Sequence, residues 1–378
     1  MTPSPQMIGA AETTLQVEAV SDYESFLAIE PEWNRLVQAI APGHPFLEHV
    51  WVRTWWDAFG AGSLLRVLVV KDSSGIAGIA PLILTRTCMF GLPVRRLGFF
   101  YNAHVPRAGF LVARRPRDVY RAIWEHLIRT RDWDLLQLCQ LPEGSDTLEE
   151  ISRLASRDCH IGLWRSQASP YIPIEGSWED FFRALPARQR SNLRNRFKRL
   201  EEAGLTELET VHVADPEALD TALRIEAMAW KGANGTAIAS DLATTQFYRL
   251  LAGRAAKLGW LRLHFLRCSG TNAAFDYSLA YGNRIHLLKV GYDPAFAAYS
   301  PSNQLLMRVL EHAFEGGLES YDFLGDAAEW KLRWTKLVQQ HYWLYITPGS
   351  VKGLALHFAK FTAVPMWKRL RDRMRRQP

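Results

Sequence analysis

The chain repeats one order of strands and a helix in its two halves, and this repetition most constrains its fold. Strand-like runs joined by the short turns KDSSG and RCSGT predict a hairpin in each half, at 64–70 with 76–84 and at 261–266 with 272–281. Pro116 and Pro301 then each open an amphipathic helix, and a short strand follows both helices. Corresponding segments lie roughly 185–196 residues apart. We interpret the pattern as a duplicated domain, although a hairpin followed by a helix also occurs in many unrelated α/β domains.

Strands and helices are mixed in both halves, which predicts an α/β (α+β) protein with mixed central sheets flanked by helices. A length of 378 residues fits two to three domains. We expect a first domain over 14–169, a second over 170–347 and a separate tail over 351–378.

The positive charge is concentrated at the C-terminal end of the chain. Residues 351–378 contain eight Lys or Arg against one Asp, a net charge of +7, whereas the whole chain carries +6. The remainder is therefore close to neutral, and no nucleic-acid partner is expected. Apolar residues at helical spacing within this basic tail suit an anionic membrane surface. The alternative is a tail packed on the body with a frayed basic end.

The sequence carries few signals of export or of metal binding. Its four cysteines are scattered without metal-ligand spacing, so no metal site is expected and a reducing compartment is indicated. The first residues lack the pattern of a signal peptide, and no apolar run approaches the roughly 18 residues of a membrane-spanning helix. We expect a cytoplasmic protein, with peripheral association at the inner face of the membrane through the tail.

A helix start in the second half suits an anion. Ser300 is the predicted N-cap, and Pro301 takes the first helical position. The first-turn N–H groups of Ser302, Asn303 and Gln304 would then face the preceding loop and could hold a pyrophosphate. The alternative is an ordinary capped helix.

The stretch YDFLGDAAEWK, which follows this helix, places ionisable side chains just after a strand. Lys331 is a candidate for neutralising a phosphate or stabilising an oxyanion. Asp322 is a candidate for orienting this lysine or for acting as a base. Asp276, a carboxylate within an apolar strand, is the second candidate base. A solvated cluster of charges at a surface turn is the alternative for the stretch.

Further candidates lie outside that stretch. Arg190 and Arg194 belong to an arginine-rich helix that either binds an anionic substrate or is a solvated basic face. Trp230 either lines a cleft or packs in the core. In the first half, Tyr101 and His104 stand in a loop between strands, where a histidine can serve as a base or be merely exposed.

Four segments, taken in order, resemble a known family. LPARQRSNLRNRFKRLEEAG (185–204), AMAWKG (227–232), the Ser-Pro helix start (300–306) and YDFLGDAAEWK (321–331) are similar to the acetyltransferase-like domain of the GNAT superfamily found in the CelD/BioF2-like group. That group is similar in turn to the Fem peptidoglycan aminoacyltransferases, which carry two GNAT-like halves.

The resemblance implies two tandem GNAT-like domains and acyl transfer, with acetyl-CoA or another acyl-CoA as co-substrate. The implied acceptor is a hydroxyl or amine of a cell-envelope or exopolysaccharide saccharide, or of its lipid-linked precursor. It also implies an active-site role for Lys331 and donor or substrate phosphates near Arg190 and Arg194. The loop AAYSPSNQ departs from the glycine-rich GNAT pattern. The alternatives are Fem-like aminoacyl transfer and a non-catalytic scaffold of a membrane-associated polysaccharide synthesis complex.

Overall fold

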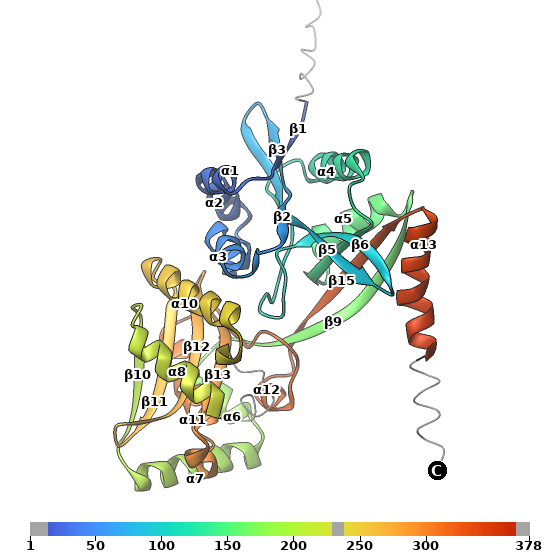
Figure 1. Ribbon diagram of the computed structural model, residues 1–378. Helices are drawn as coiled ribbons and strands as arrows, with labels where there is room; N and C mark the ends of the chain where they lie inside the picture. The colour runs from blue at the N-terminus through green and yellow to red at the C-terminus, as the bar shows by residue number, and fades with distance from the viewer. Residues whose placement is uncertain (1–13, 229–237, 368–378) are drawn as a thin grey trace, which may run out of the picture.

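A computed structural model of the protein describes residues 14–228 and 238–367 (Figure 1). The strands are β1 (Gln16–Val20), β2 (Ser63–Leu65), β3 (Val67–Asp72), β4 (Gly75–Ala80), β5 (Leu82–Met89), β6 (Leu92–Phe99), β7 (Leu111–Val112), β8 (Leu135–Pro142), β9 (Cys159–Pro173), β10 (Thr206–Val211), β11 (Leu261–Cys268), β12 (Thr271–Tyr281), β13 (Arg284–Tyr292), β14 (Ser320–Asp322) and β15 (Val338–Pro348).

The α-helices are α1 (Tyr23–Ala28), α2 (Glu30–Ile40), α3 (His49–Phe59), α4 (Pro116–Thr130), α5 (Asp146–Ala155), α6 (Trp178–Ala184), α7 (Ala187–Ala203), α8 (Pro216–Met228), α10 (Leu242–Lys257), α11 (Pro301–Glu315), α12 (Glu329–Leu332) and α13 (Val351–Phe358). Short helical turns are η1 (Pro45–Leu47), η2 (Ile238–Ser240), η3 (Pro294–Tyr299) and η4 (Ala359–Ala363).

The duplicated pattern is present in the structure. The hairpins β3–β4 and β11–β12 are antiparallel, and each half continues through a helix that begins at a proline, α4 or α11. The residues before these prolines, Arg115 and Ser300, both adopt a left-handed conformation, with φ of 49° and 51°. The predicted α/β class, with a mixed central sheet flanked by helices and the same order of elements in both halves, is confirmed.

One sheet of 11 strands joins the two halves, in the order β10-β11-β12-β13-β14-β9-β15-β8-β6-β5-β2, and a second sheet has the order β1-β3-β4-β7. The end of β9 pairs with β14 of the second half, while most of β9 pairs with β15. The strand β15 thus returns from the C-terminal part of the chain to lie between β9 and β8 (Figure 1).

The expected domain boundary at residues 169 and 170 lies inside β9, which runs through it as one strand. The division into 14–169 and 170–347 stays a prediction, since the two halves share this strand and exchange β15. The sharing matters for the site because it ties the second half to loops of the first.

The second-half sheet is covered on both faces. On one face, α8 and α10 pack on β11 and β12 and also contact helices of the first half, through side chains such as Trp51, Phe247 and Tyr277. On the other face, α6, α7 and α11 form a separate core with Leu193, Leu306 and Leu310. These apolar stripes follow the helical spacing seen in the sequence, and burying them holds the sheet edges in place.

None of the helices in residues 14–228 and 238–367 is long and apolar enough to cross a membrane. In the same residues, no group of three or more His, Cys, Asp or Glu side chains is arranged to hold a metal ion.

Candidate active site

The candidate site begins where two parallel strands separate. β13 and β14 pair in parallel from Arg284 opposite Ser320 to His286 opposite Asp322, and β14 then ends while β13 continues to Tyr292. A hollow of about 490 Å³ opens beyond this point. We call this cavity the splay hollow, because it lies where the two strands diverge. It is lined by Glu226, Leu287, Leu288, Lys289, Val290, Gly291, Tyr292, Ser302, Asn303, Phe323, Asp326, Ala328, Trp330 and Lys331.

A β-bulge shapes the strand wall of the splay hollow. On β12, Tyr277 is opposite Lys289 and the next residue, Ser278, is opposite Leu287, so Leu288 is the extra residue. A bulged residue stands outside the ladder of inter-strand hydrogen bonds. The backbone of Leu288 is therefore placed to interact with a group held in the hollow.

Four charged side chains line the splay hollow, two carboxylates and two ammonium groups. Glu226 comes from α8 and is only 1% exposed, while Asp326 is exposed at the mouth. Lys289 comes from β13 and Lys331 from α12. The combination of an acid with cations in one apolar pocket provides groups for moving a proton and for stabilising a negative charge.

Sequence reasoning missed Glu226, although a signal for it was present. It stands on the face of α8 that buries Leu219, Ala222 and Leu223, so an acid there needs a partner or a function. Its Oε2 accepts a hydrogen bond of 2.7 Å from the Ile238 N–H. This bond fixes the carboxylate at the wall of the splay hollow.

Lys331 lies where the sequence predicted it, after the strand and on a short helix. Its Nζ donates a hydrogen bond of 2.6 Å to the carbonyl of Leu324 and lies 5.6 Å from the centre of the Trp330 ring. Leu324 and Gly325 both have positive φ, at 50° and 56°, so the chain turns sharply there and α12 folds back over the hollow.

Asp322 supports this turn and is not among the lining residues. Its Oδ1 accepts a 2.9 Å bond from the Leu324 N–H, and its Oδ2 lies 2.5 Å from Nη2 of Arg107. Both side chains of the ion pair are about nine-tenths buried, with 7% and 11% exposure. Arg107 belongs to the loop between β6 and β7 of the first half. The first half thereby holds the turn that carries Lys331 in the second.

Three histidines surround the Arg107–Asp322 ion pair between the two halves. Arg107 Nε lies 3.3 Å from His341 Nε2, and His286 Nδ1 lies 4.0 Å from Asp322 Oδ2. Burial lowers the pKa of His286 and of His341 to about 4, and it lowers the pKa of His44 well below its usual value. All three rings are therefore neutral at pH 7.

Asp276 lies away from the splay hollow. It is 2% exposed, its Oδ1 lies 2.6 Å from His264 Nδ1, and it accepts a 3.0 Å bond from the Ser278 hydroxyl. The structure thus groups Asp276 with a buried histidine of the neighbouring strand and does not bring it together with Lys331.

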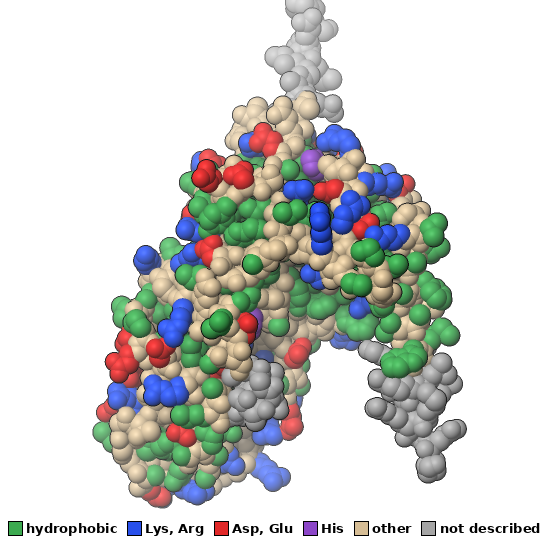
Figure 2. Space-filling model, viewed as in Figure 1, with side chains coloured by type: hydrophobic (Ala, Val, Ile, Leu, Met, Phe, Trp, Pro, Cys, Tyr) green, Lys and Arg blue, Asp and Glu red, His purple; other side chains and the backbone are tan. Residues whose placement is uncertain are grey.

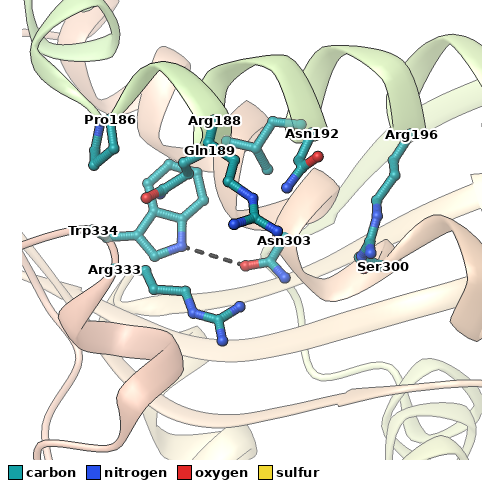
Figure 3. A pocket seen from close by; sticks show the side chains of 10 residues that line it. Pro186, Arg188, Gln189, Asn192, Arg196, Ser300, Asn303, Arg333 and Trp334 are labelled. Carbon is teal, nitrogen blue, oxygen red and sulfur yellow. Dashed lines mark hydrogen bonds between the residues drawn. The ribbon is translucent and has the colours of Figure 1, made fainter.

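A second hollow of about 400 Å³ adjoins the first at Asn303 (Figure 3). It is called here the arginine hollow, and it is lined by Pro186, Arg188, Gln189, Asn192, Leu193, Arg196, Ser300, Asn303, Arg333 and Trp334. Three guanidinium groups and no carboxylate are among these ten side chains. Arg188 and Arg333 extend toward Asn303, while Arg196 donates a hydrogen bond to the hydroxyl of Ser300. Such a surface favours an anionic group.

Several polar groups at the predicted helix start, the beginning of α11, form hydrogen bonds within the protein. Ser300 takes the N-cap position, but its side chain makes no capping bond. The N–H groups of Asn303 and Gln304 donate to the Ser300 carbonyl at 3.0 and 3.2 Å. The Gln304 side chain is fully buried and donates to the carbonyl of Leu193. Ser302 and Asn303 are the two helix-start residues that line the splay hollow.

Arg190 and Arg194 point to another side of α7. Both line an outer hollow of about 840 Å³ between α6, α7 and α11. Arg190 donates to the carbonyls of Arg183 and Leu185 at the end of α6, and the Arg194 guanidinium lies 5.2 Å from the Phe182 ring. The structure does not bring these two arginines together with Lys331.

The first-half candidates lie at contacts between elements. Burial raises the pKa of Tyr101 to about 12, and its ring meets Trp343 edge to face at 5.4 Å. Burial lowers the pKa of His104 to about 4, and its Nδ1 lies 3.2 Å from the hydroxyl of Tyr248. Tyr248 in turn packs under Lys289 of the splay hollow, at 5.3 Å. His104 thus lies behind the hollow wall.

Trp230 falls outside the described residues.

The comparisons identify the class of protein that has this architecture. Residues 187–332 match the acetyltransferase (GNAT) domain family, and this range contains both the splay hollow and most of the arginine hollow. Residues 187–332 are therefore similar to a GNAT acetyltransferase domain, in line with the sequence resemblance. No curated protein matched the sequence.

Among solved structures, the chain is similar to several over most of its length. FemX matches with a TM-score of 0.58 and 13% identity, over 86% of this chain and 96% of FemX. A Bacteroides thetaiotaomicron protein of unknown function matches with a TM-score of 0.55 and 11% identity, over 88% of this chain and 100% of that protein. The C-terminal domain assigned to a lysylphosphatidylglycerol synthetase of Agrobacterium fabrum matches with a TM-score of 0.52 and 12% identity, over 89% of this chain and 96% of that domain. At these identities the likeness establishes the fold alone, and the chain shares that fold with FemX and with the two other structures.

Proposed function

We propose that the protein transfers an acyl group, acetyl in the first instance, from an acyl-CoA to an amine or hydroxyl group. The observation that carries the proposal is the pair of adjoining hollows at the separation of β13 and β14. The splay hollow is mostly apolar and is lined by a bulged strand, which suits an acyl-pantetheine arm. The other presents three arginines and no acid, which suits phosphates.

The residues of the splay hollow support a direct transfer. The acceptor N–H or O–H group attacks the thioester carbonyl, a new C–N or C–O bond forms, and the C–S bond breaks. Glu226 takes the proton from the acceptor and passes it to the departing thiolate, which leaves as the free thiol. The Lys331 ammonium and the backbone of the bulge stabilise the negative charge on the carbonyl oxygen during the attack.

Glu226 is a better candidate for the base than Asp322 or Asp276, the two carboxylates that the sequence suggested. Asp322 is engaged by Arg107 and the Leu324 N–H, and Asp276 is engaged by His264, whereas Glu226 lines the hollow itself. Asp322 is better suited to positioning Lys331 through the turn at Leu324.

We further propose that the acceptor is a cell-envelope or exopolysaccharide saccharide, or its lipid-linked precursor. The support is the sequence resemblance to the CelD/BioF2-like group. Mass spectrometry of envelope glycans from cells with and without the protein tests this acceptor: an acyl-bearing species should disappear in the cells that lack it. Identical glycans in both would contradict the acceptor class while leaving the acyl-transfer proposal to the next experiment.

The chemistry is tested by thiol release from acetyl-CoA in the presence of an envelope saccharide fraction. We expect release to require the protein, and Glu226→Gln to lower the rate by about 10²-fold or more. Glu217→Gln, on the exposed face of the same helix, should behave as the wild type. Full activity of Glu226→Gln would remove the base from the scheme. Absence of any acetyl-CoA binding would instead favour Fem-like aminoacyl transfer or a scaffold role.

A further inference from the structure

The helix α13 buries one apolar face and leaves another uncovered. Gly353 and Leu356 face the sheet. A Cβ atom at position 353 would lie only 2.0 Å from the Pro348 carbonyl oxygen, and Leu356 is 3% exposed. On the outer side, Val351, Leu354 and Phe358 are 88%, 53% and 54% exposed. A soluble surface helix is expected to be polar on that side, so the uncovered apolar stripe calls for an explanation.

Neighbouring elements extend this apolar surface. The tip of the β5–β6 hairpin exposes Phe90 and Leu92, and Met89 beside them packs in the same cluster as Leu356. Beyond α13, Met366 and Trp367 are also more than half exposed. Figure 2 shows hydrophobic side chains gathered along the edge of the molecule that α13 forms. We call the exposed set Phe90, Leu92, Val351, Leu354, Phe358, Met366 and Trp367 the α13 surface.

The charge next to the α13 surface indicates its partner. The eleven residues that follow Trp367 include six Lys or Arg and one Asp. A cationic segment that follows an exposed apolar patch in the sequence suits an anionic lipid surface, where apolar side chains enter the headgroup region and cations attract the lipid phosphates. A second copy of the chain on this patch would bring two such cationic segments together, and their repulsion disfavours that occupant.

We propose that the α13 surface docks the protein on a membrane that contains anionic lipids. This surface adds the hairpin tip and the outer face of α13 to the basic tail that the sequence already suggested. The proposal does not depend on the acyl-transfer chemistry, because none of its residues lines the splay or arginine hollow.

Co-sedimentation of the full chain with vesicles tests the proposal. We expect binding to vesicles that contain phosphatidylglycerol, little binding to vesicles of phosphatidylcholine alone, and weaker binding as salt is raised. The double variant Leu354→Asp with Phe358→Asp should bind at least tenfold more weakly. Leu242→Asp is the matched control, because Leu242 is 88% exposed at the start of α10, in the second half. It should bind as the wild type does.

Circular dichroism and thermal unfolding establish that the double variant is folded, as expected for changes at exposed positions. Binding of the double variant equal to that of the wild type would overturn the proposal. So would a wild type that ignores anionic vesicles and forms a dimer which the double variant dissociates, since that result would assign the α13 surface to a second copy.

Discussion

The two halves share a fold but differ at the equivalent helix start, and the difference shows what makes one of them a site. Both helices begin with a left-handed residue followed by proline, Arg115 with Pro116 and Ser300 with Pro301. In the first half, Arg115 pairs with Asp118 of its own helix. In the second half, three arginines line the arginine hollow together with Ser300 and Asn303, and no acid is among its lining residues. The backbone conformation is the same at both helix starts, so the surrounding charges alone favour the second half for the anion site that we propose.

The strands next to these helices differ as well. In the second half, β13 continues past its pairing with β14 and opens the splay hollow. In the first half, β6 pairs in parallel with β8 and ends at Phe99, and the chain then leaves as a loop. That loop carries Arg107 to Asp322 of the second half. The second half contains the splay hollow, and a loop of the first half supports it. The first half has a smaller hollow of about 270 Å³ beside β6 and β8, and no lysine equivalent to Lys331 is among its lining residues.

The largest effect is expected at this support. Arg107→Ala leaves the buried Asp322 carboxylate without its partner, and removal of one member of a buried ion pair costs about 3–5 kcal/mol. Urea unfolding should show this loss of stability, and Arg107→Lys should restore part of it. Stability within about 1 kcal/mol of the wild type would show that the first half does not hold the turn at Leu324.

The buried histidines should make the joined halves sensitive to acid. The pKa of His286 is about 4 in the folded state because of burial, against an ordinary value of about 6.5, so between these values the unfolded chain takes up a proton that the folded chain does not. Stability is therefore complete above about pH 7 and is lost as the pH falls toward 4, by about 3 kcal/mol for this histidine. The groups facing His286 are Asp322, Arg107 and Arg284.

Denaturant unfolding across this pH range measures the loss. Between about pH 4 and pH 6.5, the free energy of unfolding should rise less steeply with pH in His286→Gln than in the wild type. The difference in slope should correspond to one proton. Equal slopes in the two proteins would mean that His286 is not held neutral between the halves.

Substitution of Lys331 in the splay hollow tests the role of the second half in the proposed reaction. Lys331→Met removes the ammonium group while keeping a side chain of similar length. We expect thiol release to slow by about 10- to 100-fold, because an electrostatic stabiliser of the transition state is lost. An unaltered rate, in a variant shown to be folded, would remove Lys331 from the reaction.

The smallest effect is expected at the first-half counterpart. The Arg115–Asp118 pair is more than one-third exposed on both sides, so Arg115→Ala should change stability by less than about 1 kcal/mol. It should also leave acetyl-CoA binding unchanged. Weakened binding in a thermal-shift titration would show that the first half contributes its own site.

The sequence allowed the repeated elements to be predicted because their signals are local. The hairpins, the proline-opened helices and the position of Lys331 follow from periodicity over a few residues. The pairing of Trp343 with Trp164 could not be predicted, since it joins strands from distant parts of the chain and depends on the exchange of β15 between the halves. The predicted boundary consequently falls inside the continuous strand β9.

The candidate site was predictable only in part for the same reason. Ser302, Asn303 and Lys331 line the splay hollow as a strand–helix–strand pattern would suggest. Glu226 could have been found, because an acid on the apolar stripe of α8 is a local signal. Arg107 could not, since its partner Asp322 lies 215 positions away and the intervening fold alone brings them together.

Calorimetric titration of acetyl-CoA into the full chain tests the central claim that the second half alone holds the donor. We expect one site per chain, weakened at least tenfold by Arg196→Glu and unaffected by Lys198→Glu, a charge reversal at an exposed position of the same helix. Arg115→Glu should likewise have no effect. Two sites per chain, or equal binding by Arg196→Glu and the wild type, would contradict the account.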